Sequence, residues 1–298
     1  MLLPATDEQK SVAGGRQMTK TTMLLPATDE QPAYRTRMVT VGELLSCFCT
    51  RLMVASSTGF DSGLSLDYVY RNKPTGRTPL GRAIDRAYLE SIGWRGIRQR
   101  RIHLEKTLRE TIEHIRRDHR SVKILDVAAG AGRYVLETMR HCDGNGTLTA
   151  RLRDYKPENV SAARDLAGEY GLASVTTELG DAFDTEAVGT LRPQANIGIV
   201  SGLYELFPSN DKVLSSLAGL RDAVEHGGYL IYTNQPWHPQ LAFIAAVLRN
   251  REGEPWVMRR RSTAEMDELV RVSGFQKISM LVDNWGMFTV SVAQRVAA

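Results

Sequence analysis

The chain has 298 residues, of which 42% are hydrophobic and 24% are charged, values that are typical of a globular protein. Three cysteines are too few for a disulfide framework and fit a reducing compartment. The start of the chain lacks a signal-peptide pattern, and its most apolar stretch, residues 38–55, is shorter than the roughly 20 residues that span a bilayer. We therefore expect a cytoplasmic protein.

The N-terminal segment contains a repeat. The nonapeptide MLLPATDEQ occurs at residues 1–9 and again at 23–31, with no periodic continuation that would indicate a solenoid. We interpret residues 1–37 as a poorly ordered leader that lies outside the fold. Cys47 and Cys49 follow it without a histidine cluster, so we expect no zinc site.

Residues 38–121 predict an N-terminal helical region. Helical spacing of apolar residues covers 41–53, 80–88 and 97–117, with a Gly/Ser-rich break at 56–65 and a proline-containing loop at 71–79. Leu104, Leu108, Ile112 and Ile115 mark one face of the last helix. We expect these helices to cap the domain that follows, so that a chain beginning at residue 122 would keep the core of the fold.

The helical region is also basic. The net charge of the chain is +4, but residues 71–120 alone hold 14 Lys or Arg and 6 Asp or Glu. Such a segment can bind an anionic partner, namely phosphate, nucleic acid or a lipid surface, or it can be the solvated face of amphipathic helices. We favour the solvated face.

From residue 122 onward, short apolar runs alternate with helical patterns. The expected strands are 122–127, 146–151, 175–179, 196–201, 229–234, 276–283 and 287–293. The expected helices between them are 134–142, 157–170, 211–225 and 263–273. This alternation predicts a Rossmann-like, doubly wound α/β domain over 122–298 with a seven-stranded, mostly parallel sheet. Only three residues join the last two strands, so the last strand is expected to be antiparallel.

The first of these strands leads into a turn of very small residues. The strand ends at Asp126, and Ala128-Ala-Gly-Ala-Gly132 precedes a helix. A dinucleotide site would continue G-x-G-x-x-G, but the third position is Val135. The run Asp-x-Ala-x-Gly-x-Gly instead resembles the first motif of class I S-adenosylmethionine-dependent methyltransferases, with alanine at the first glycine. The alternative is a tight turn that holds no ligand.

Acidic residues follow the next two strands. Asp154 can accept hydrogen bonds from ribose hydroxyls, or it can cap the helix that begins at Pro157. The resemblance implies that Asp181 binds the adenine amino group, and that the end of the fourth strand faces the transferable methyl group. The cofactor-binding residues that it implies are Asp126, Ala128, Gly130, Gly132, Tyr134, Asp154, Tyr155, Asp181, Ala182, Phe183, Ser201 and Gly202.

A closer resemblance rests on four longer runs. They are GWRGIRQR at 93–100, SGLYELFP at 201–208, QPWHPQ at 235–240 and WVMRRRS at 256–262. They resemble a bacterial group of class I methyltransferases that is often fused to, or encoded near, α/β-hydrolase domains and phospholipid head-group enzymes. No hydrolase motif G-x-S-x-G occurs in this chain, so we expect a version without the hydrolase.

Methyl transfer is an in-line displacement that needs a base only when the acceptor arrives protonated. The candidates are His238, Glu205 and Tyr204; alternatively, His238 shapes a loop between two prolines, and Glu205 binds the cofactor's amino group or caps a helix. Trp237 and Tyr204 could wall an acceptor pocket or simply pack. We expect no metal. A NAD-dependent oxidoreductase and a catalytically silent cofactor-binding or scaffold protein remain alternative functions.

The acceptor is expected to be a small-molecule or lipid-like anion, with peripheral contact to a membrane. Two arginine clusters motivate this hypothesis: residues 95, 98, 100 and 101, and residues 259–261. A nucleic-acid partner is disfavoured because the fourth strand lacks the Asn/Asp-Pro-Pro-Tyr/Phe run of enzymes that methylate the amines of bases. The oligomeric state stays open.

Overall fold

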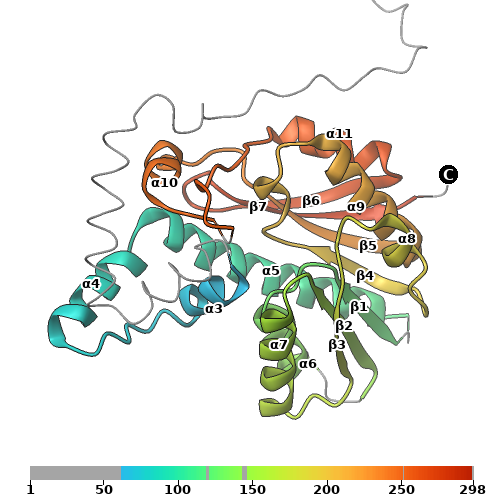
Figure 1. Ribbon diagram of the computed structural model, residues 1–298. Helices are drawn as coiled ribbons and strands as arrows, with labels where there is room; N and C mark the ends of the chain where they lie inside the picture. Colours follow the sequence, from blue (N-terminus) through green and yellow to red (C-terminus); the bar gives the residue numbers. More distant parts are fainter. Residues whose placement is uncertain (1–61, 119–120, 143–145, 251, 297–298) are drawn as a thin grey trace, which may run out of the picture.

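The computed structural model describes residues 62–118, 121–142, 146–250 and 252–296 (Figure 1). The repeated nonapeptide, both early cysteines and the helix expected at 41–53 lie outside these residues.

A single seven-stranded sheet organises the described chain, in the order β3-β2-β1-β4-β5-β7-β6. The strands are β1 (Val122–Asp126), β2 (Leu148–Asp154), β3 (Val175–Leu179), β4 (Ala195–Val200), β5 (Val224–Asn234), β6 (Phe275–Val282) and β7 (Thr289–Arg295). Strands β1 to β5 pair in parallel, whereas β7 is antiparallel to both of its neighbours. The predicted doubly wound sheet with an antiparallel last strand is confirmed.

Helices cover both faces of the sheet (Figure 1). One face carries α5 (Ile92–Arg116), α6 (Arg133–Cys142) and α7 (Pro157–Glu169), and the other carries α8 (Thr185–Gly189), α9 (Asn210–Ala223) and α11 (Thr263–Val272). Neighbouring residues of β1 show the alternation, since Ile124 packs into the first core cluster and Leu125 into the second. The short α8 and α10 (Leu241–Val247) and the turn η1 (Tyr204–Leu206) were not predicted, because such short segments carry no clear period.

Among the residues that the structure describes, two further helices precede α5, namely α3 (Gly63–Arg71) and α4 (Pro79–Leu89). The interpretation of 56–65 as a break is wrong from Ser62 onward. The Ser62 hydroxyl accepts from the Ser65 N–H at 3.2 Å and caps α3, and Asn72 ends that helix in the left-handed conformation, with φ of 50°. The loop at 71–79 and the helix after it were predicted correctly.

Helix α5 is longer than predicted, because it begins at Ile92 instead of residue 97. Its first half packs in a third cluster with Trp256, Met287 and Phe288, and the Trp94 and Trp256 rings stack at 6.2 Å. Its second half packs on the sheet through the predicted apolar face. The division into a cap and a domain at residue 122 stays a prediction, but α5 contributes to the cores on both sides of that boundary.

Within the described ranges, no helix combines the length and the hydropathy needed to cross a membrane.

Candidate active site

The small-residue turn after β1 has a backbone that only glycine adopts readily. Gly130 and Gly132 have φ of 57° and 65°. A Cβ on Gly132 would lie 2.6 Å from the Leu152 Cδ1 atom, so this glycine also lets the turn pack against β2. The Ala129 N–H donates to the Arg153 carbonyl at 2.9 Å. The turn is therefore held against β2 with its outer side free of side-chain bulk.

Asp126 shapes this turn from beneath. Its carboxylate is completely buried and accepts hydrogen bonds from the Ala128 N–H at 3.1 Å and from the Tyr134 hydroxyl. Burial raises the pKa of Asp126 to about 7. Asp126 is completely buried and does not line the pocket beside this turn, so we interpret it as a residue that holds the turn without touching a ligand.

Asp154 joins the end of β2 to the same turn. One oxygen accepts from the Gly130 N–H at 2.8 Å, and the other accepts from the Lys156 N–H and the Asn159 amide, both at 2.9 Å. A carboxylate oxygen has room for more than one donor, so these bonds position Asp154 and still leave acceptor capacity. The side chain lies at the wall of a pocket.

This pocket, about 600 Å³ including its open mouth, lies at the carboxyl ends of β1, β2 and β4. Open parallel sheets bind ligands at this edge. Six of the predicted cofactor residues line it, namely Ala128, Gly130, Tyr134, Asp154, Ser201 and Gly202. The sequence analysis missed other wall residues, which are Gly63, Leu66, Asp67, Tyr70, Ala129, Ala131, Arg133, Asn159, Leu203 and Leu206. Four of these come from α3, and its caps at Ser62 and Asn72 were the signal that could have revealed that helix.

The remaining predicted cofactor residues lie outside the pocket lining. Tyr155 is 63% exposed, Asp181 is exposed and accepts from the Phe183 N–H at 2.9 Å, and Ala182 packs in a core cluster. The Phe183 ring meets the Phe207 ring edge-on at 4.5 Å. Their assignment to the adenine end of the cofactor remains a prediction.

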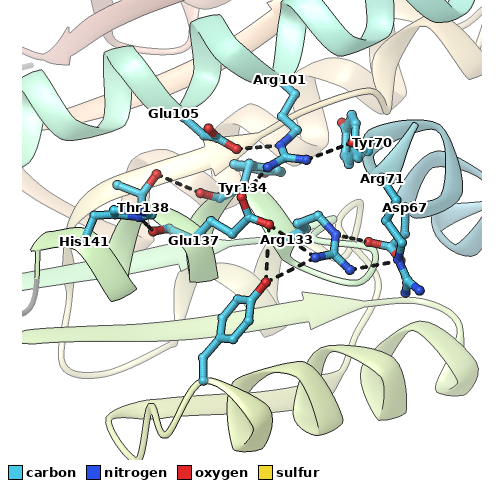
Figure 2. Close-up of polar contacts among 11 residues, drawn as sticks. Asp67, Tyr70, Arg71, Arg101, Glu105, Arg133, Tyr134, Glu137, Thr138 and His141 are labelled. Carbon is cyan, nitrogen blue, oxygen red and sulfur yellow. Dashed lines mark hydrogen bonds and ion pairs between the residues drawn. The ribbon is translucent and has the colours of Figure 1, made fainter. Parts of the chain in front are cut away.

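An ion-pair network holds α3 beside the turn. Figure 2 shows the Arg133 guanidinium between Asp67 of α3 and Glu137 of its own helix, while Arg101 of α5 donates to Glu137 and to the Tyr70 carbonyl. A Cβ on Gly130 would lie 3.3 Å from the Cα atom of Gly63. Helix α3 therefore covers one side of the turn.

The three candidate bases do not line the pocket. The Tyr204 hydroxyl donates to Ser216 at 2.9 Å, and Glu205 pairs with Arg100 at 3.1 Å. The His238 Nδ1 atom accepts from the Gln240 N–H at 3.1 Å, and a Cβ on Gly93 would lie 2.9 Å from its Nε2 atom. The loop-shaping alternative for His238 fits these contacts better than a role as base. Trp237 is largely exposed.

The arginine clusters are engaged within the protein. Buried Arg261 donates to the carbonyls of Tyr204 and Phe207, at 2.5 and 2.7 Å, and buried Arg259 pairs with Glu265. In the first cluster, residues 98, 100 and 101 form ion pairs, and residue 95 lies over the Trp285 ring. These side chains hold helices and loops together, which weakens the argument that the clusters grip an anion.

The burial of His238 predicts a pH-dependent stability. Burial lowers the pKa of His238 to about 4, against an opposing effect of Asp283. The unfolded chain then binds the extra proton between pH 6.5 and 4, so the free energy of unfolding should fall as the pH falls through this window, by on the order of 3 kcal/mol. Chemical denaturation at pH 7.5 and pH 4.5 should show that His238→Asn loses less stability on acidification than the wild type. Equal losses would contradict the assignment.

Comparisons with known proteins identify a matching family model and a relative of similar sequence. A family model described as "Putative methyltransferase" matches residues 5–295. "Uncharacterized protein YnbC" of Escherichia coli K12 is 48% identical over 255 residues, which are 85% of this chain and 43% of YnbC. The chain thus spans less than half the length of this curated relative.

Two solved structures share the fold at low sequence identity. A "possible exported protein" from Bordetella parapertussis has a TM-score of 0.65 and 18% identity, over 92% of this chain and 100% of that one. Magnesium protoporphyrin IX methyltransferase from Synechocystis PCC 6803, solved with bound SAH, has a TM-score of 0.53 and 13% identity, over 82% of this chain and 99% of that one.

Proposed function

This chain belongs to the "Putative methyltransferase" family, and from that premise we propose that it transfers the methyl group of S-adenosylmethionine to a small-molecule or lipid-like acceptor. The observation that carries the proposal is the pocket in which the small-residue turn, Asp154 and the Ser201–Gly202 end of β4 meet. A methyltransferase needs these three features together: close backbone approach, an acceptor for ribose hydroxyls, and an open strand end.

The residues of the pocket fit such a cofactor. Asp154 would accept from the ribose hydroxyls, and the turn from Ala128 to Ala131 would lie against the cofactor's amino-acid portion. Val135 is completely buried in the core beneath the turn, where a dinucleotide-binding chain would have its third glycine. This packing supports S-adenosylmethionine over NAD. When bound, S-adenosylmethionine supplies an electrophilic methyl carbon attached to a sulfonium.

Methyl transfer depends mainly on the alignment of the acceptor atom with the methyl carbon and the sulfur. The acceptor atom forms a bond to the methyl carbon in line with the carbon–sulfur bond that breaks, and alignment of this kind contributes on the order of 7–11 kcal/mol. Helix α3 covers the turn and excludes water on that side. Because Tyr204, Glu205 and His238 are engaged elsewhere, we propose an acceptor atom that carries a free lone pair at neutral pH.

The shape of the site supports a small acceptor. Helices α3 and α5 wall the pocket on one side, with Leu66 and Tyr70 among its lining residues. We propose Leu80 of α4 and Phe243 of α10, which are exposed apolar side chains, as points of peripheral contact with a membrane that would present a lipid-like acceptor. Arg95 of α5 is also exposed and carries a positive charge.

The proposed function predicts that S-adenosylhomocysteine is released when the enzyme meets its acceptor. Purified protein, S-adenosylmethionine with a labelled methyl group and a bacterial extract should give a labelled organic-soluble or small polar product, detected by mass spectrometry. Binding without release in any fraction would favour the silent scaffold.

The partner class is tested separately by flotation with anionic and neutral liposomes, beside salt-titrated DNA and RNA binding. We expect enrichment on anionic liposomes. Tight nucleic-acid binding with a steep salt dependence would instead assign the basic segment to nucleic acid.

A further inference from the structure

A buried ion pair lies at the wall of the pocket, between Arg100 of α5, which lines the pocket, and Glu205 of η1, which is not among the lining residues. Arg100 is only 2% exposed, and it lines the pocket beside Tyr70, Tyr134 and Gly202. Its Nη1 atom donates to the Glu205 Oε1 atom at 3.1 Å, and its guanidinium lies 5.1 Å from the centre of the Phe288 ring.

Each residue of this ion pair has one buried polar atom without a hydrogen-bond partner in the described part of the chain. The Arg100 Nε atom and the Glu205 Oε2 atom are both buried, and neither has a hydrogen-bond partner within the described residues. A buried polar atom without a partner costs on the order of 1–3 kcal/mol. Among the described residues, Arg100 thus offers the pocket a donor that lacks an acceptor, and its partner Glu205, next to the lining residues, has an acceptor oxygen that lacks a donor.

The geometry of Arg100 favours a carboxylate. Glu205 occupies the Nη1 end, which leaves the Nε and Nη2 side, the edge that can hold a carboxylate with two parallel N–H bonds. Gly202 has φ of 68° and no side chain; a Cβ there would lie 2.9 Å from Nη2. Burial opposes the charge of Arg100, but Tyr70 and Glu205 outweigh it and raise its pKa, so the cation persists.

The opposite charges of Arg100 and Glu205 favour a ligand that carries both a negative and a positive group. Arg100 and Glu205 together are neutral, so a lone anion would be attracted by Arg100 and repelled by Glu205. A zwitterion satisfies both unmatched atoms and adds no net charge to a buried site. An amino acid has this pattern, with a carboxylate and an ammonium group on one carbon.

We propose that Arg100 and Glu205 bind the amino-acid end of the S-adenosyl cofactor, Arg100 its carboxylate and Glu205 its ammonium group. The inference rests on the proposed function and assigns the end of the cofactor opposite the ribose that Asp154 would hold. It gives Arg100 a role as a specificity residue that its position in a basic run of sequence does not reveal.

The test compares two ligands that differ only at this end. S-adenosylhomocysteine carries the amino acid, and 5′-methylthioadenosine retains the nucleoside and sulfur without it. Calorimetry on the full chain should show that Arg100→Gln weakens S-adenosylhomocysteine binding by roughly 10–150-fold, the range expected for a lost charged hydrogen bond. Binding of 5′-methylthioadenosine should not change. Glu205→Gln should shift the ratio of the two affinities in the same direction.

Arg259→Gln is the matched control. Arg259 is also 2% exposed and pairs with a glutamate, Glu265, but it does not line the pocket. The Arg259→Gln variant should be less stable than the wild type and should keep the wild-type ratio of the affinities for the two ligands. If Arg100→Gln does not fold, Arg100→Lys, which keeps the cation without the side-on pair of N–H groups, gives the same comparison.

An unchanged ratio in the folded Arg100 variant overturns this inference alone. Failure of the wild type to bind either ligand overturns the proposed function, and the inference with it.

Discussion

Replacing Asp154 by alanine should weaken S-adenosylhomocysteine binding by roughly 10–150-fold, or about 1.5–3 kcal/mol. The substitution removes the carboxylate proposed to accept from the ribose hydroxyls. It also releases the Gly130 N–H and the Asn159 amide, which the carboxylate holds at 2.8 and 2.9 Å. The turn would then lose both its ligand contact and one of its anchors to β2, while the bond from the Ala129 N–H to the Arg153 carbonyl remains. Calorimetry at constant pH, with circular dichroism as a check on folding, measures the change.

Asp181→Ala is the comparison for this prediction. Asp181 lies two residues after the end of β3, whereas Asp154 is the last residue of β2. Asp181 is exposed, and its carboxylate accepts a local N–H from Phe183. A much smaller loss of affinity is expected. If Asp154→Ala bound as tightly as the wild type, Asp154 would have to be removed from the cofactor site.

A chain that begins at residue 122 should fail to fold. Helix α5 ends before this point and packs against β1, β5 and β7. Its side chains Leu104, Leu108, Ile112 and Ile115 are each 2% exposed or less. Burial of one such side chain contributes roughly 1.5–3 kcal/mol, and the four together about 6–12 kcal/mol, which is comparable to the whole stability of a domain. This reverses the expectation, drawn from the sequence alone, that the shortened chain keeps its core.

The measurement is urea denaturation of the shortened chain followed by circular dichroism, where we expect no cooperative transition. In the full chain, Leu108→Ala should cost about 2–5 kcal/mol, whereas Ile102→Ala, at a 61% exposed position of the same helix, should change little. A cooperative transition in the shortened chain would show that α5 is dispensable.

The sheet was predictable because its signals are local. Each strand is a short apolar run, and the turn after β1 is marked by an unbroken run of alanine and glycine from Ala128 to Gly132. The acids at the ends of β1 and β2 were identified from the same pattern, yet their environments differ: Asp126 is enclosed by Ala128 and Tyr134, while Asp154 faces the pocket. Sequence spacing places a residue at a strand end but does not say whether it points inward.

The contacts of the charged side chains were harder to predict from the sequence. Arg259 and Arg261 belong to the arginine cluster that motivated an anionic acceptor. In the structure, Arg259 donates to the Pro208 carbonyl and pairs with Glu265, and Arg261 donates to the Tyr204 carbonyl. Helix α3 escaped notice because its nine residues follow a Gly/Ser-rich stretch and bury few apolar side chains. Both cases depend on contacts between distant segments, which a local pattern cannot display.

The antiparallel direction of β7 separates the end of the sheet from the pocket. Because β7 runs against β5, Arg295 lies beside the start of β5, where its guanidinium donates to the Val224 carbonyl. The pocket lies at the other ends of the parallel strands, so the end of β7 lies on the opposite edge of the sheet from the pocket. A fluorescent label, a surface tether or a fused protein attached after β7 would therefore emerge away from the mouth through which ligands enter.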